Sequence, residues 1–297
     1  ADGSLWGMGV NQFGVGPAIQ NTRFGPIRLN VSSVKLAFAG DADTLILTDS
    51  STSSTTVTTT PSTTTAPPST TTTLPGGGTV YVTGGNYYGV LGLYDQINRL
   101  TWTRWTPPTT LPAFRQVMMR ADVAFAVEYD IIPGIEGQVY AAGAFRYGAL
   151  PGNTGPRFRP IAGLAALSVA GNEQSFFAVR QNGALFACGA NDHYELGLGD
   201  RVFRTQFLQV PGVTSVSSVS VGYNHVVLRK TDGTVWVAGS NSKGQLGLGA
   251  AVTEAQVFTQ VPLITDATAV MAREDGTMIL RRNPSTGRPS GDSSTTP

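Results

Sequence analysis

Short stretches in which apolar and polar residues alternate recur along the chain, separated by glycine-rich segments. Residues 213–221 alternate in this way, and a second apolar run ends at Leu228. Alternation with a period of two is typical of half-buried β-strands. The Asp232-Gly233 pair that follows the second run is typical of a hairpin turn. The pattern therefore predicts units of about four short antiparallel strands.

One short phrase recurs five times along the chain. It consists of a glycine, a small or polar residue, an apolar residue, an aromatic residue, two further residues and a second glycine. The copies occupy residues 3–9, 78–84, 137–143, 183–189 and 233–239. In four of the five copies an asparagine stands two residues after the last glycine. These asparagines are Asn11, Asn86, Asn191 and Asn241.

Repeated units of 40 to 60 residues with four strands each are typical of β-propeller blades. A lone four-stranded sheet leaves an apolar face open to water, so such units stack around an axis. A β-sandwich is the alternative, but it gives no reason for this recurrence. Residues 276–280 begin a sixth, shorter copy after a curtailed run at 261–269. We therefore expect an all-β propeller of five or six four-stranded blades, with an incomplete or unusually closed ring.

The stretch from residue 181 to 249 resembles the regulator of chromosome condensation family of propeller repeats. The segments that carry the resemblance are residues 183–191, 195–200, 222–225, 231–236, 239–241 and 244–249. The resemblance extends more weakly over most of the chain. Propellers of this family usually close with seven blades, so five phrases imply a smaller number here.

A threonine-rich tract interrupts the first part of the chain. Between residues 50 and 73, 19 of 24 residues are Ser or Thr. Such a tract buries too little apolar surface to fold alone. It stands in the predicted hairpin between the strands at residues 45–48 and 80–83. A solvated loop, an O-glycosylated stalk and an arm ordered against neighbouring subunits are the three alternatives for it.

The extent of the repeats and the position of the tract predict one domain over residues 1–282, with an inserted segment at 50–77 and a polar tail at 283–297.

Charged residues make up 13 % of the chain and the net charge is +1. Such a small net charge produces only a weak electrostatic field, which argues against a strongly basic nucleic-acid binder. A single cysteine excludes an internal disulfide framework. We expect no signal peptide in the given chain and no membrane span, because no apolar run approaches ~20 residues.

Residues with catalytic potential are few. His225 stands in the Gly-x-x-His slot of the family that the chain resembles, which implies a structural hydrogen bond within the blade. His193 has too few neighbouring ligands for a metal site, and Cys188, inside a strand phrase, is expected to be a small buried residue. We expect no catalytic residue, no metal site and no cofactor, and therefore a protein that is not an enzyme.

The function expected from these features is that of a structural or protein-binding propeller in a large assembly, such as a phage or virus particle. Its partners are then other protein subunits, with no specific nucleic acid, and its location is the particle itself. The expected contact residues are Tyr87, Tyr88, Trp102, Trp105, Thr58, Thr64 and Thr71. Ordinary packing between blades is the alternative role for each aromatic residue.

Two other functions remain open. The resemblance implies a guanine-nucleotide exchange factor that acts on a small GTPase. The fold itself does not imply this activity, because propellers serve many functions. A secreted adhesin or inhibitor propeller is the other alternative.

Overall fold

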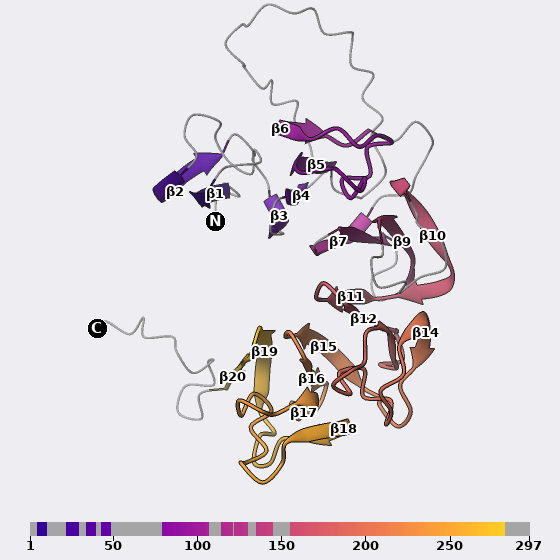
Figure 1. Ribbon diagram of the computed structural model, residues 1–297, viewed down its shortest axis with the longest axis vertical. Coiled ribbons are helices and arrows are strands. Elements are labelled where there is room, and N and C mark those ends of the chain that lie inside the picture. The colour runs from indigo at the N-terminus through magenta and orange to yellow at the C-terminus, as the bar shows by residue number, and fades with distance from the viewer. Residues whose placement is uncertain are drawn as a thin grey trace, which may run out of the picture.

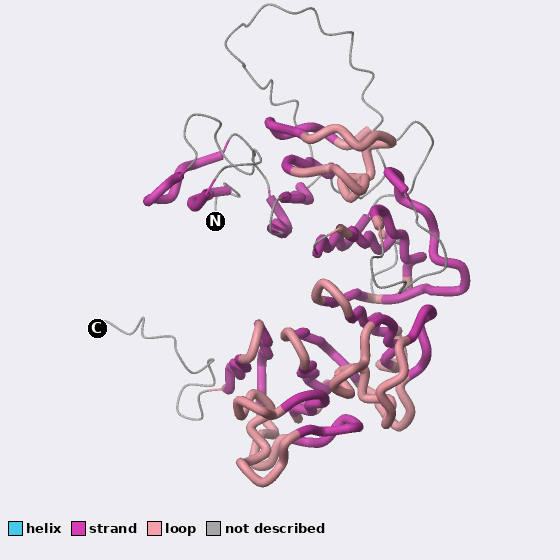
Figure 2. Tube along the Cα trace, in the orientation of Figure 1, coloured by secondary structure: helices cyan, strands magenta, loops and turns pink. Residues whose placement is uncertain are grey.

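A computed structural model of the protein describes only part of the chain. The described residues are 5–10, 22–29, 34–39, 43–48, 79–106, 114–120, 122–129, 135–144 and 155–282. Side chains are described from Val80 onward. Within these ranges the chain forms strands joined by turns and loops, without helices (Figure 2). The threonine-rich tract and the tail at 283–297 lie outside the described residues.

Four sheets contain four strands each, and we number them as blades in chain order. Blade 1 comprises β3 (Val34–Ala39), β4 (Asp43–Thr48), β5 (Thr79–Gly84) and β6 (Arg99–Arg104). Blade 2 comprises β7 (Phe114–Arg120), β8 (Val123–Glu128), β9 (Gly137–Gly143) and β10 (Gly155–Ala166). Blade 3 comprises β11 (Ser168–Gly171), β12 (Ser175–Val179), β13 (Leu185–Gly189) and β14 (Arg204–Gln209). Blade 4 comprises β15 (Val216–Val221), β16 (His225–Lys230), β17 (Val235–Ser240) and β18 (Glu254–Gln260).

Two further sheets contain only two strands each. One comprises β1 (Leu5–Val10) and β2 (Thr22–Leu29), and the other comprises β19 (Ala267–Arg273) and β20 (Gly276–Arg281). Figure 1 shows all six sheets following one another around an arc, with these two pairs at its opposite ends. The first strands β7, β11 and β15 lie toward the centre of the arc, and β10, β14 and β18 lie on its outside. The described part of the chain is thus a β-propeller fold whose ring is open.

The recurring phrase forms the third strand of every complete blade, in β5, β9, β13 and β17. Each blade is an antiparallel meander in which neighbouring strands in sequence pair with one another. The predicted hairpin between β4 and β5 is confirmed, because Leu47 pairs with Val80 and Thr48 pairs with Thr79. Thr48 and Thr79, the described residues that border the inserted segment, therefore lie side by side in this sheet.

Apolar side chains fill the spaces between neighbouring blades. Phe125 of β8 meets Phe176 of β12 with ring centroids 5.0 Å apart, and both side chains are buried. Phe177 and Leu228 belong to the next cluster, between blades 3 and 4. Burying a side chain of this size contributes about 1.5–3 kcal/mol. The stacking of blades thus supplies the core that a single four-stranded sheet lacks.

The aromatic residue of the phrase packs toward the preceding blade in blades 2, 3 and 4. Tyr140 contacts the cluster between blades 1 and 2, Phe186 the cluster between blades 2 and 3, and Trp236 the cluster between blades 3 and 4. All three rings are only partly buried. Their outer edges remain at the surface while one side of each ring covers the core.

The interpretation of residues 276–280 as a sixth phrase is wrong. These residues form β20, which pairs with β19 as β16 pairs with β15: Ala272 opposes Thr277, and Val221 opposes Val226. β20 is therefore a second strand rather than a third. The strand before it runs from Ala267 to Arg273, later than the run expected at 261–269. A glycine followed by alternating apolar residues suits either strand position, so the local pattern misassigned it.

Candidate protein-binding face

The loops between the third and fourth strands of blades 1, 3 and 4 are built around one buried asparagine each. The side-chain oxygen of Asn86 accepts a hydrogen bond from the backbone N–H of Leu91 at 3.0 Å. Asn191 and Asn241 accept equivalent bonds from Leu196 at 2.9 Å and from Leu246 at 2.8 Å. These asparagines are the residues that follow the phrase in the sequence. Their recurrence therefore reflects a repeated loop structure.

The same asparagines also donate through their side-chain nitrogens. Asn86 donates to the carbonyl oxygen of Asp95 at 2.9 Å, and Asn191 donates to that of Asp200 at 2.6 Å. Asn241 donates to the carbonyl oxygen of Val252 at 2.6 Å. A carboxamide suits this role because it offers an acceptor and two donors on a short side chain. Each asparagine thus joins the two halves of its loop.

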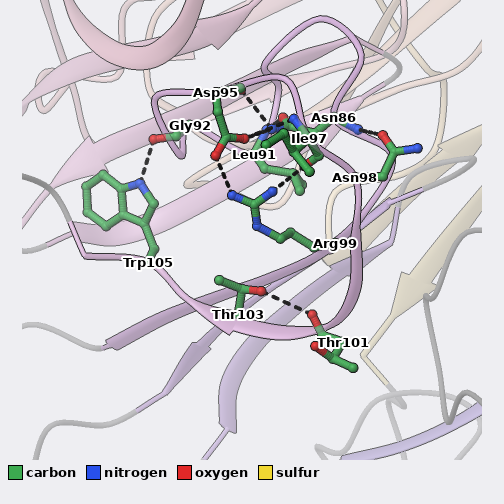
Figure 3. A network of polar contacts seen from close by, with 10 residues as sticks. All are labelled: Asn86, Leu91, Gly92, Asp95, Ile97, Asn98, Arg99, Thr101, Thr103 and Trp105. Carbon is green, nitrogen blue, oxygen red and sulfur yellow. Dashed lines mark hydrogen bonds and ion pairs between the residues drawn. The ribbon is translucent and has the colours of Figure 1, made fainter. Parts of the chain in front are cut away.

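An ion pair closes the loop in blades 1 and 3, and Figure 3 shows the pair in blade 1. Asp95 binds Arg99 at 2.6 Å, and Asp200 binds Arg204 at 2.6 Å. Partial burial acts to raise the pKa of Asp95, but the Arg99 guanidinium and the N–H of Ile97 outweigh it and lower that pKa. The backbone N–H of Val202, followed by Arg204, lowers the pKa of Asp200. Both aspartates are therefore held ionised in these loops.

The loops between first and second strands adjoin these asparagine loops. The N–H of Ala190 donates to the carbonyl of Gln174 at 3.0 Å, and the N–H of Ser240 donates to that of Asn224 at 2.9 Å. Both sets of loops therefore share one end of the blades, which we call the Asn-loop face. Large apolar side chains stand exposed on it, between 54 % and 74 % of their area: Tyr87, Ile97, Val202 and Tyr223. These exposed side chains make this end of the blades the candidate protein-binding surface.

The contact residues expected from the sequence lie in different places. Tyr87 and Tyr88 lie in the Asn86 loop, where their rings meet edge to face at 4.8 Å. Trp102 is partly buried on β6. Trp105 is a core residue: its Nε1–H donates to the carbonyl of Gly92 at 2.9 Å, and its ring packs on Phe158. The alternative role, packing between blades, therefore describes Trp105.

The three threonines expected as contacts, Thr58, Thr64 and Thr71, lie outside the described residues. Three exposed residues were not expected: Ile97, Val202 and Tyr223. A signal for two of them exists in the sequence, because Asp95-x-Ile97-x-Arg99 and Asp200-x-Val202-x-Arg204 repeat one pattern. In both patterns the aspartate binds the arginine, and the middle residue is exposed.

His225 makes a structural hydrogen bond, as the sequence implied, but with the neighbouring sheet and not within its own blade. Its Nε2 lies 3.0 Å from the hydroxyl oxygen of Thr277, across the boundary between blade 4 and β20. Since that hydroxyl donates to the carbonyl of Gln245 at 2.7 Å, Nε2 is the donor toward Thr277. Burial lowers the pKa of His225, against an opposing effect of Asp275. The ring is therefore neutral at pH 7 and packs as a core residue.

Two further residues of chemical interest are also buried. Cys188 is fully buried, and burial raises the pKa of its thiol well above the ordinary value, which disfavours a reactive thiolate. Glu195 accepts a hydrogen bond from the N–H of His193 at 2.8 Å, and burial raises the pKa of the Glu195 carboxyl.

Among the described residues no group of three or more potential metal ligands is present. The same residues contain no helix that is long and apolar enough to cross a membrane.

Comparison with known proteins agrees with this architecture. The patterns of the regulator of chromosome condensation (RCC1) repeat match residues 182–228 and 216–245. The ultraviolet-B receptor UVR8 of Arabidopsis thaliana is 28 % identical over 176 residues, which cover 56 % of this chain and 38 % of that protein. The X-linked retinitis pigmentosa GTPase regulator of Mus musculus is 30 % identical over 94 residues, 31 % of this chain and 9 % of that protein. The chain thus spans less than half the length of these relatives.

Solved structures show the same fold. Human WBSCR16 superposes with a TM-score of 0.71 at 19 % identity, over 94 % of this chain and 67 % of that one. Prp20p of Saccharomyces cerevisiae superposes with a TM-score of 0.66 at 16 % identity, over 92 % and 63 %. The protein is therefore an RCC1-like β-propeller. Regulator of chromosome condensation repeats, as the sequence predicted, are present at residues 182–245, in blades 3 and 4.

Proposed function

We propose that this protein is a protein-binding propeller that holds its partner on the Asn-loop face. The observation that carries the proposal is the exposure of Tyr87, Ile97 and Val202 on loops fixed by buried hydrogen bonds. Tyr223 is exposed on the same face, in the loop between β15 and β16. A rigid loop loses little conformational entropy when a partner covers it. Less of the free energy gained by burying its apolar side chains is therefore offset by ordering the loop. The relatives support a binding role: Prp20p is described by its binding to Gsp1p and histones, and in complex with Kap60.

The setting that we propose is a larger assembly, such as a phage or virus particle, in which other subunits supply the partner surface. The low charge and the many exposed apolar loop residues support this setting, since subunit contacts bury apolar area and are depleted of charge. In this proposal the protein acts by binding and not by catalysis, and its location is the particle. A free protein in its source material would argue against the setting.

Regulation of a small GTPase is the second candidate. The supporting observation is the similarity to a protein named as a GTPase regulator, over 31 % of this chain. Fluorescent-nucleotide release from a panel of small GTPases, with catalytic amounts of this protein, tests it. Unchanged release across the panel would exclude the activity for those GTPases.

The binding proposal is tested by replacing the exposed residues. A variant with Tyr87→Ser, Ile97→Ser, Val202→Ser and Tyr223→Ser is compared with the unmodified protein in capture from the native source material. A control variant carries Leu208→Ser and Val257→Ser, two exposed residues on the outermost strands β14 and β18. We expect the face variant to lose proteins that the control still retains. Identical capture by all three proteins contradicts the proposal.

A further inference from the structure

One leucine has a backbone conformation that ordinarily belongs to glycine. Leu263, in the loop between β18 and β19, has a φ of 62°. In this left-handed region the Cβ of an L-residue crowds the following carbonyl oxygen, which glycine avoids because it has no Cβ. Among the described residues with a left-handed backbone, Leu263 is the only aliphatic one. The backbone is therefore strained at this leucine.

The loop between β14 and β15 has the same structure and contains a glycine at this position. That residue is Gly212, with a φ of 70°. The N–H of Val210 donates to the carbonyl of Leu185 at 2.8 Å. In the same way, the N–H of Val261 donates to that of Val235 at 2.8 Å. In both loops a proline precedes the left-handed residue, an arrangement typical of a type II turn, which favours glycine.

The side chain of Leu263 gains no contact that offsets this strain. It is 91 % exposed, the largest fraction among the described large apolar side chains. A Cβ at Gly212 would likewise have no neighbour within 4 Å, although blades 3 and 4 lie on either side of it. Exposure is thus a property of the turn position. The next residue, Ile264, packs against the core beside blade 4, so the loop is held while Leu263 projects from it.

Leu263 lies at the end of the blades opposite the Asn-loop face. Consecutive strands of a meander run in opposite directions. The loops from fourth to first strands therefore share one end with the turns between second and third strands. The N–H of Ala267 accordingly donates to the carbonyl of Gly233, in the turn between β16 and β17, at 3.0 Å. We call this end the Leu263 surface.

Polar groups accompany the leucine on the Leu263 surface. In the same loop, Asp266 binds Arg281 at 2.6 Å, and both side chains are partly exposed. In the adjoining turn, Asp232 is exposed, and hydrogen bonds from the hydroxyl and N–H of Thr234 lower its pKa. Both aspartates are therefore charged at neutral pH. The surface thus presents one apolar side chain among polar and charged groups.

This arrangement suits a protein pocket better than a lipid bilayer. A single leucine gains too little from a bilayer to anchor a protein, since even a myristoyl chain binds a membrane only marginally. The carboxylates of Asp232 and Asp266 also disfavour an anionic lipid surface. A pocket in a protein surrounds a leucine on all sides, and the polar groups around it then form the rim of the interface.

We propose that the Leu263 surface is a second protein-binding surface, on which Leu263 inserts into an apolar pocket of a partner protein. Insertion supplies the apolar burial that the side chain lacks in the free protein. Residues in strained conformations cluster at functional sites for this reason. Together with a partner on the Asn-loop face, the protein then bridges two other proteins.

Thermal unfolding tests the first part of this inference without a partner. Leu263→Gly is expected to raise the melting temperature, because glycine adopts this backbone without crowding. Gly212→Leu, the reverse change in the matching loop, is expected to lower it. A lower melting temperature for Leu263→Gly would mean that Leu263 stabilises the fold, and would overturn the inference.

Site-specific photo-cross-linking in native source material tests the second part. The photoreactive residue p-benzoylphenylalanine replaces Thr265, which is exposed in the same loop, and the matched control carries it at Thr214, the equivalent exposed position between β14 and β15. We expect an adduct with another protein at position 265 only. The adduct must persist in the variant with serine at positions 87, 97, 202 and 223, because the two surfaces lie at opposite ends of the blades.

The protein in the adduct is then purified, and its affinity is measured by calorimetry for the unmodified chain and for Leu263→Ala. We expect Leu263→Ala to bind about tenfold more weakly, because its side chain fills less of the pocket. Equal affinities would overturn the inference. So would the lack of an adduct at position 265, an adduct only with a second copy of this chain, or its loss in the four-serine variant.

Discussion

Replacing Asn191 by alanine is the sharpest probe of the loops that hold the Asn-loop face. The asparagine is 1 % exposed and joins the N–H of Leu196 to the carbonyl of Asp200. Truncation of Asn191 leaves the buried N–H of Leu196 and the part-buried carbonyl of Asp200 without these partners. Each such loss costs about 1–3 kcal/mol, so we expect the two together to destabilise the fold by about 2–6 kcal/mol.

The matched control is Asn182→Ala, in the turn between β12 and β13. Asn182 also accepts one backbone hydrogen bond, from Ala184 at 3.0 Å, but it is exposed, so water replaces its contact. We expect this control to cost about 0.5 kcal/mol. The assay is urea unfolding followed by tryptophan fluorescence, together with hydrogen exchange at Leu196. The reasoning is refuted if Asn191→Ala lowers the free energy of unfolding no more than Asn182→Ala does. It is also refuted if the Leu196 amide stays protected from hydrogen exchange in Asn191→Ala.

Three other changes test separate parts of the account. The methyl group added by Gly197→Ala would meet the ring of Phe258. Gly212→Ala is the control, because Gly212 also has a left-handed backbone but an added methyl group there would enter open space. We expect the first to lower the melting temperature more, and equal losses would contradict the packing between blades. Burial raises the pKa of Glu195, so its cost to stability is absent below the ordinary value of 4.5 and grows as pH rises through it. Glu195→Gln should therefore gain stability relative to the unmodified protein between pH 4 and pH 7 in thermal unfolding, and a relative loss would contradict this. Burial lowers the pKa of His225, so its contribution to stability is complete above 6.5 and falls as the pH drops below that value. His225→Asn should flatten the fall in melting temperature between pH 7 and pH 5.5, and an unchanged slope would contradict the assignment.

The repeat architecture could be predicted from the sequence because its signals are local. The phrase at residues 233–239 contains the alternation of a strand, the aromatic residue that packs toward the preceding blade and a glycine near the end of the strand. The asparagine after it marks the loop. All of these lie within ten residues of one another, and they repeat. Recurrence therefore indicated both the strand type and the fold.

Features that depend on distant residues were not predictable in this way. The hydroxyl of Thr277 reaches His225 across 52 positions of sequence. β20 was misassigned because a second and a third strand share the same alternation, and only pairing distinguishes them. Ile97 and Val202 are apolar, and apolar residues are ordinarily expected inside. Both stand in loops that an aspartate–arginine ion pair closes.

The size of the protein in its native source material tests the central claim, that the Asn-loop face binds protein, most directly. Light scattering on gently separated extracts gives the mass for the unmodified protein and for the variant with serine at positions 87, 97, 202 and 223. A complex with other proteins that dissolves in the variant is the predicted result. A free single chain in the unmodified sample, or a complex unchanged by the four substitutions, would contradict it.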